Sequence, residues 1–174
     1  HTSDFLVTVL GDSLSPQWMP AVIFGLAGFT AFATGSSWGV MGIMMPLVVP
    51  LAWAVLEHNG MAGTAEGMPL LYASVAGVLA GAVWGDHCSP LAETTLLAAM
   101  ASGCDLIDHV RTQLPYAMLV GIVALLFGAL GTGFGLPWWL GLAGGVATLT
   151  AVLFTLGQRA TAATKVATAS DASA

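Results

Sequence analysis

Two carboxylates, Asp86 and Glu93, lie close together in an apolar part of the sequence and are its strongest candidates for chemistry. No Asp, Glu, Lys or Arg occurs in residues 67–85 or 94–104, on either side of them. A carboxylate at the centre of a bilayer costs about 2.5–3.5 kcal/mol on insertion scales, so acidic residues at that depth usually line the path of an ion or a substrate. The pair therefore indicates an ion or substrate site.

Oxygen atoms near the two carboxylates could complete such a site. Ser89, Thr94 and Thr95 carry hydroxyl groups, and an interrupted helix would free the main-chain carbonyl of Asp86. Carboxylate, hydroxyl and carbonyl oxygens are the ligands that suit a hard cation. This set therefore predicts cation binding at residues 86–95.

A second polar stretch, residues 34–39, could face the first one across the membrane interior. The hydroxyl groups that it would supply belong to Thr34, Ser36 and Ser37. Residues with an imidazole or a further carboxylate are candidates for relaying protons or tuning the site. These are His87, Asp108 and His109. The last two lie in a short polar segment, where charges are more often solvated than functional.

The elements that position these residues are interrupted by proline. Pro90 has no N–H, so a helix through it would leave the carbonyl of Asp86 without a partner. Ser89 and Pro90 are also typical of a helix start, with Glu93 in the first turn. The sequence therefore predicts that one helix ends near Gly85 and another begins near Ser89. Interrupted helices of this kind form the binding sites of secondary transporters.

The composition is that of an integral membrane protein. Of the 174 residues, 57% are hydrophobic and only 7% are charged, and three Lys and Arg against nine Asp and Glu give a net charge of −6. A soluble domain has about 25% charged residues. The bilayer is therefore the expected partner, and the low basic content excludes nucleic acid. We expect this bilayer to be a cytoplasmic membrane of bacterial type.

The apolar stretches predict an all-α polytopic membrane protein. Residues 1–17 are expected to be a loop or the end of a missing N-terminal part. Residues 18–56 form either two full spans joined by a tight turn or a re-entrant hairpin whose tip, residues 34–39, stops at mid-membrane. The polar tip suits ion coordination and favours the hairpin.

Residues 68–103 are too long for one straight span. A helix of this length would measure about 54 Å, against a hydrocarbon core of about 30 Å, so a broken helix is predicted. Its first half has small residues at every fourth position, a spacing that lets another helix approach closely. These residues are Ala73, Gly77, Gly81 and Gly85.

The C-terminal part is expected to contain an interfacial helix and two ordinary spans. Residues 104–113 are amphipathic and end before Pro115, while residues 114–130 and 138–156 are apolar. Residues 157–174 read as a disordered tail. Arg159 and Lys165 in this tail place the C-terminus, and with it the segment that holds Arg111, in the cytoplasm.

Two other kinds of site are disfavoured. His87, Cys88, Cys104 and His109 match no standard zinc spacing. Asp86, His87 and Ser89 have the residue types of a hydrolase triad, but they are nearly adjacent, whereas triad members converge from separated positions. We therefore expect neither an enzyme nor a metal or organic cofactor.

Three motifs in order resemble the NhaC family of Na+/H+ antiporters. They are Thr34-Gly35-Ser36-Ser37-Trp38-Gly39, then Gly85-Asp86-His87-Cys88-Ser89-Pro90, and then residues 104–116, CDLIDHVRTQLPY. The resemblance runs from about Phe29 to Tyr116. It implies the C-terminal half of an inverted-repeat secondary transporter with a re-entrant hairpin and a broken helix, whose partner is the N-terminal repeat. A second copy of the protein, in a homodimer, is a further candidate partner.

The resemblance implies exchange of Na+ for H+ by alternating access. Asp86 or Glu93 would bind Na+ when ionised and H+ when neutral, so the two ions compete for one group. Family members that exchange organic acids, such as malate with lactate, and relatives thought to move amino acids leave a coupled solute transporter as the alternative. A non-transporting membrane scaffold is an alternative of another class, which the cost of burying both carboxylates disfavours.

Overall fold

The computed structural model describes residues 15–157, so the predictions for residues 1–14 and 158–174 fall outside it. The described residues form helices and no strand. In order these are η1 (Pro16–Trp18), α2 (Met19–Thr34), α3 (Ser37–His58), α4 (Gly67–Cys88), α5 (Glu93–Ser102), α6 (Leu106–Val123), η2 (Ala124–Leu130, a π-helix), α7 (Gly131–Gly133) and α8 (Trp138–Leu156).

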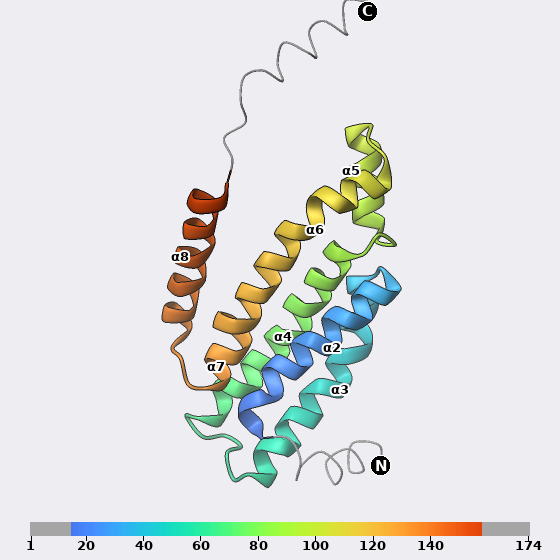
Figure 1. Ribbon diagram of the computed structural model, residues 1–174. Helices are drawn as coiled ribbons and strands as arrows, with labels where there is room; N and C mark the ends of the chain where they lie inside the picture. Colours follow the sequence, from blue (N-terminus) through green and yellow to red (C-terminus); the bar gives the residue numbers. More distant parts are fainter. Residues whose placement is uncertain (1–14, 158–174) are drawn as a thin grey trace, which may run out of the picture.

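The helices form one elongated bundle (Figure 1). Helices α2, α3, α4 and α6 run side by side, α5 projects beyond the others at one end, and α8 lies along one edge. Five helical stretches of the described chain are long and apolar enough to cross a membrane: Pro16–Thr34, Ser37–His58, Gly67–Cys88, Leu106–Gly133 and Trp138–Leu156. The chain is therefore an all-helical membrane protein, as its composition predicts.

Helix α2 packs on α4 through main-chain contacts made possible by glycine. A Cβ atom on Gly77 would lie 2.9 Å from the carbonyl oxygen of Pro20, and Cβ atoms on Gly81 and Gly85 would overlap the carbonyls of Phe24 and Gly28. Each pair is four residues further along both helices, so the two helices stay in one register. The four-residue spacing of small residues thus marks a close helix contact, as predicted.

The core lies between α2, α3 and α4. Its larger cluster is made of buried side chains from all three helices: Met19, Ile23, Val48, Ala52, Val55, Leu56, Leu70 and Val78. A smaller cluster closer to the α2–α3 turn consists of Ala27, Ala31, Val40 and Ala82. These clusters join the α2–α3 hairpin to α4 over most of its length.

Trp84 attaches α6 to this core. Its ring stacks on Phe24 at a centroid distance of 5.4 Å, and its Nε1 donates a hydrogen bond of 2.8 Å to the carbonyl of Ala117. Gly121 permits this contact, since a Cβ atom there would overlap the indole ring. The second half of α6 is thereby held against the end of α4 that carries Asp86.

The predicted boundary between an interfacial helix at 104–113 and a span at 114–130 does not exist in the structure. Asp105 caps α6, with its carboxylate accepting a hydrogen bond of 2.8 Å from the N–H of Ile107, and the helix continues through Pro115. Proline removes a single N–H there, a loss that membrane helices tolerate when neighbouring groups compensate for it. The segment is therefore one long helix rather than two.

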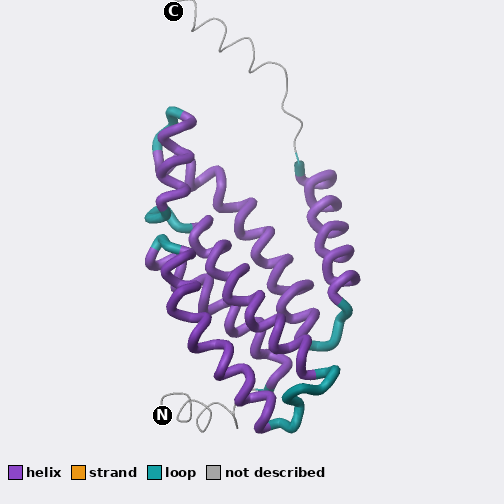
Figure 2. Tube along the Cα trace, turned by 180° about the vertical axis from the view of Figure 1, so that it is seen from behind, coloured by secondary structure: helices purple, strands orange, loops and turns teal. Residues whose placement is uncertain are grey.

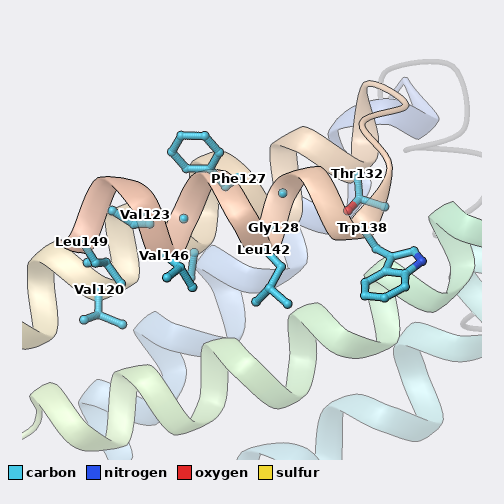
Figure 3. Close-up of a pocket in the computed structure, with 12 residues that line it drawn as sticks. Val120, Val123, Phe127, Gly128, Thr132, Trp138, Leu142, Val146 and Leu149 are labelled. Atoms are coloured by element: carbon cyan, nitrogen blue, oxygen red, sulfur yellow. The ribbon is translucent and has the colours of Figure 1, made fainter. Parts of the chain in front are cut away.

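An apolar groove of about 440 Å³ separates α8 from α6 and η2 (Figure 3). Val120, Phe127, Leu142 and Val146 lie along it, and Thr132 and Trp138 close one end. No residue that lines it carries a titratable side chain. This groove therefore offers no chemistry, and the candidate site lies elsewhere in the bundle.

Candidate functional site

The break in the α4–α5 segment lies a few residues later than predicted. Helix α4 continues to Cys88, Ser89 is its C-cap in an extended conformation, and α5 begins only at Glu93. The reason is Pro90, which forces the preceding residue out of the helical region. The expectation that Ser89 caps a following helix is therefore wrong, and so is the free carbonyl of Asp86, which accepts a hydrogen bond of 3.0 Å from the N–H of Ser89.

Ser89 instead fixes the break against α2. Its hydroxyl donates a hydrogen bond of 2.7 Å to the carbonyl of Phe32 and accepts one of 3.1 Å from the N–H of Leu91. Phe32 is four residues beyond Gly28, so this bond continues the register of the α2–α4 contact. Ser89 is fully buried, and both of its bonds are thus shielded from solvent.

The turn between α2 and α3 closes on the same break. Gly35 has a φ of 69°, a left-handed conformation that favours glycine, and a Cβ atom there would lie 2.7 Å from the carbonyl oxygen of Leu91. Ser36 caps α3 by accepting a hydrogen bond of 3.3 Å from the N–H of Gly39. The hairpin turn therefore rests directly on residues 89–92.

Asp86 lies where these segments meet. Its side chain is 8% exposed. One carboxylate oxygen accepts a hydrogen bond of 3.3 Å from the N–H of Ser37, and the other accepts one of 3.2 Å from the hydroxyl of Thr94. The carboxylate thus has donors from α3 and α5 although it belongs to α4. Both donors are neutral, and no Lys or Arg of the described chain pairs with it.

Of the hydroxyl groups predicted to surround Asp86, only that of Thr94 contacts it in the structure. Thr34 donates back to the carbonyl of Thr30 at 2.8 Å, and Ser37 contributes its main-chain N–H rather than its hydroxyl. Thr95 is buried, with a hydroxyl that has no partner in the described chain. The main-chain donor was not predicted, because side-chain types do not indicate which N–H faces a carboxylate.

Glu93 is not brought to Asp86. It lies exposed in the first turn of α5, and no hydrogen bond or ion pair joins its side chain to any described residue. The two carboxylates predicted to share a cation therefore have different surroundings. Only that of Asp86 is buried and hydrogen-bonded.

The three residues proposed to relay or tune protons also differ. The side chain of His87 is exposed, while its carbonyl accepts a hydrogen bond of 2.6 Å from Nε2 of Gln113. Asp108 is exposed at the start of α6. Nε2 of His109 is buried and has no partner in the described chain. Gln113, which links α6 to the end of α4, was not singled out by the sequence.

The residues considered for a metal site do not form one. Cys88 is buried, Cys104 is exposed, and both are free thiols. Within residues 15–157, no group of three or more His, Cys, Asp or Glu side chains could hold a metal ion. What the geometry offers is one buried carboxylate, that of Asp86, with two neutral hydrogen-bond donors.

Comparison with known proteins connects this geometry to a family. The chain is 30% identical over 119 residues to the Na(+)/H(+) antiporter NhaC of Alkalihalophilus pseudofirmus, which covers 66% of this chain and 23% of that protein. It is 37% identical over 117 residues to the arginine/ornithine antiporter ArcD of Halobacterium salinarum, with coverages of 64% and 22%. It is 31% identical over 112 residues to the malate-2H(+)/Na(+)-lactate antiporter of Bacillus subtilis, with coverages of 63% and 21%.

The chain thus spans less than a quarter of the length of these three relatives. No solved structure matches it. The sequence profile of the Na+/H+ antiporter family matches residues 1–132, a region that contains α2 to α6 and every residue of the candidate site. On this match over most of its length, the chain belongs to the Na+/H+ antiporter family.

Proposed function

We propose that this chain is the ion-binding segment of a secondary active antiporter that exchanges Na+ for H+ by alternating access across a cytoplasmic membrane. The observation that carries the proposal is Asp86, a buried carboxylate without a basic partner in a helix that could span the membrane. A carboxylate in such surroundings is stabilised either by a bound cation or by protonation. One group can therefore carry Na+ in one direction and H+ in the other.

The position of Asp86 supports its role as the exchanging group. The carboxylate is held between the N–H of Ser37 on the hairpin and the hydroxyl of Thr94 beyond the break. A shift of either segment changes its donors, so the affinity for a cation depends on conformation. Alternating access requires such a dependence, because an ion must be bound on one side and released on the other.

The arrangement of the hairpin supports the re-entrant interpretation. Figures 1 and 2 show the α2–α3 turn level with the α4–α5 break, while α5 and the start of α6 extend further in the same direction. A turn at that level would lie inside the membrane, beside the interrupted helix. The alternative of two full spans remains compatible with the lengths of α2 and α3.

A coupled transporter of organic acids or amino acids is the second candidate. It is favoured by the relatives named for arginine/ornithine and malate/lactate exchange, the first of which has a higher identity to this chain than NhaC does. In that case Asp86 would bind the coupling ion and the solute would bind beside it. The remainder of a full-length protein, including an N-terminal repeat, would complete the site in both cases, and a homodimer is an open alternative for the assembly.

The test uses the full-length protein that contains this segment, reconstituted into liposomes with a pH-sensitive dye inside. A Na+ gradient should drive proton movement, and Asp86→Asn should reduce it to the level of empty liposomes. Glu93→Gln should retain a measurable fraction, because Glu93 is exposed and makes no contact with Asp86. Glu57→Gln, at the far end of α3, is the matched control.

Three outcomes separate the alternatives. Proton movement that appears only after addition of arginine with ornithine, or malate with lactate, would assign the chain to the solute transporters. Full exchange in Asp86→Asn would show that this carboxylate is structural. A protein that folds normally but moves neither ions nor solutes, with or without Asp86, would be the membrane scaffold.

A further inference from the structure

Two side-chain atoms of the described chain are buried without a hydrogen-bond partner there: the hydroxyl oxygen of Thr95 and Nε2 of His109. Thr95 is only 3% exposed, so its hydroxyl is withdrawn from the surroundings of the bundle. Buried polar groups in native proteins are nearly always hydrogen-bonded, either to protein or to ordered water. The two atoms therefore require a polar partner.

Thr95 belongs to α5 and His109 to α6, two helices that contact each other. Helix α5 contacts α6 and α4, and its two buried residues, Thr95 and Ala99, share one face. On α6, His109 lies one turn before Gln113, which bonds to the end of α4, and two turns before Ala117, which bonds to Trp84. Residues at this spacing share a helix face, so His109 lies on the face of α6 that Gln113 directs toward α4.

We infer that Thr95 and His109 form a buried site for one water molecule, which ties α5 to α6 and thereby positions Thr94 on Asp86. A water molecule fits both atoms, because a hydroxyl both donates and accepts, and Nε2 of a neutral imidazole does one or the other. The bridge needs no particular tautomer of His109. The inference rests on the proposed exchange at Asp86 and assigns two positioning residues to it.

Few side-chain hydrogen bonds fix the first turn of α5. Ala92 occupies its N-cap without a side-chain hydrogen bond, and Glu93 is exposed. Within residues 15–157, the hydroxyl of Thr94 is hydrogen-bonded only to Asp86. Because Thr94 and Thr95 are neighbours in the first turn, the contact made by Thr95 sets the orientation of Thr94 toward the carboxylate.

The test measures Na+-driven proton movement by variants of the full-length protein in liposomes. Thr95→Val keeps the shape of the side chain but removes one partner and leaves Nε2 of His109 buried and unsatisfied. It should raise the KM for Na+ about tenfold and change kcat by less than about twofold, because it loosens the site without removing the exchanging group. Thr95→Ser, which keeps the hydroxyl, should restore the KM to near its original value.

The double variant Thr95→Val with His109→Leu separates this role from direct proton transfer. Replacing both buried partners by apolar groups is far less costly than removing one, so the double variant should recover most of the lost affinity. A KM unchanged by Thr95→Val, or a double variant worse than either single one, would overturn the inference. The second result would make His109 a proton carrier in its own right.

A spectroscopic measurement tests the water site independently of transport. Magnetisation transfer from water to the ring nitrogens of His109, followed by solid-state NMR on labelled full-length protein in lipid, should be strong and should fall in Thr95→Val. Absence of transfer in the unmodified protein would contradict the site even if exchange is normal. Conversely, strong transfer in a protein that exchanges no ions would support the site while the proposed function fails.

Discussion

Gly35 is the residue on which the contact between the hairpin and the helix break depends. Its φ of 69° is one that other residues adopt at a cost, and its α-carbon faces the carbonyl of Leu91. Gly103, in the turn after α5, has nearly the same φ of 65° but has nothing within 4 Å of the position that a Cβ atom would take. Comparing substitutions at these two glycines therefore separates the effect of main-chain strain from the effect of steric contact.

Gly35→Ala should destabilise the protein more than Gly103→Ala. Both variants pay about 1–2 kcal/mol for a left-handed residue, and only the first also pushes the turn away from residues 89–92. The comparison requires thermal unfolding of the purified full-length protein in detergent, together with Na+-driven proton movement. Equal loss of stability in both variants, with equal transport, would show that the contact with Leu91 is unimportant.

Some of the individual residues of the site can be predicted from the sequence, and others cannot. Asp86 was identified because a carboxylate in apolar sequence has few structural explanations, and it is the buried one. Glu93 looked equivalent in the sequence, but its exposure depends on how the short α5 is turned. Ser37 is 49 positions from Asp86, and no local pattern indicates that its N–H faces that carboxylate.

Among the elements, the contact between α2 and α4 has the sharpest sequence requirement. A Cβ atom on Gly85 would overlap the carbonyl of Gly28, whereas Gly25 on α2 has nothing within 4 Å of its Cβ position. Both glycines are inside helices, where alanine is intrinsically preferred. Their substitution by alanine should therefore have opposite effects.

Gly25→Ala should raise the stability of the folded protein by about 0.5–1 kcal/mol, through a better helix propensity. Gly85→Ala should lower it by about 1–3 kcal/mol, the usual cost of overpacking, because α2 and α4 must separate. Thermal unfolding in one detergent, with both variants of the full-length protein side by side, measures the difference. A stabilising Gly85→Ala would mean that the two helices are not in main-chain contact.

The bounds of helix α6 could not be predicted from the sequence. Pro115 and the polar residues before it suggested a boundary, yet the helix runs from Leu106 through Val123. The sequence could not reveal that Trp84 and Gln113 hold this part of α6 against α4 on both sides of the proline. The spacing of small residues in α4, in contrast, was sufficient to predict that another helix packs closely against it.

For the whole molecule, the helices fix which loops share a side of the membrane. The turn between α5 and α6 and the C-terminal end of α8 lie at one end of the bundle, and the α3–α4 connection lies at the other (Figure 1). The start of α6 and the C-terminal end of α8 therefore share one end of the bundle. The assignment of that side to the cytoplasm rests on the distribution of basic residues.

Cys104 offers a direct test of this orientation. It is an exposed thiol in the α5–α6 turn, while Cys88 is buried. A membrane-impermeant maleimide should therefore label the full-length protein in inside-out vesicles and not in intact cells, with Cys104→Ser as the control for any other reactive thiol. Labelling from the outside of intact cells would reverse the proposed topology.

The close contact between α2 and α4 also has a mechanical consequence. Glycines at three successive turns interlock with main-chain carbonyls, and the hydroxyl of Ser89 adds a hydrogen bond at the fourth. Sliding one helix along the other would separate all of these contacts at once, so α2 and α4 should move as one rigid body. Any hinge that changes access to Asp86 must then lie outside this pair of helices, in the short links at residues 35–36 and 90–92.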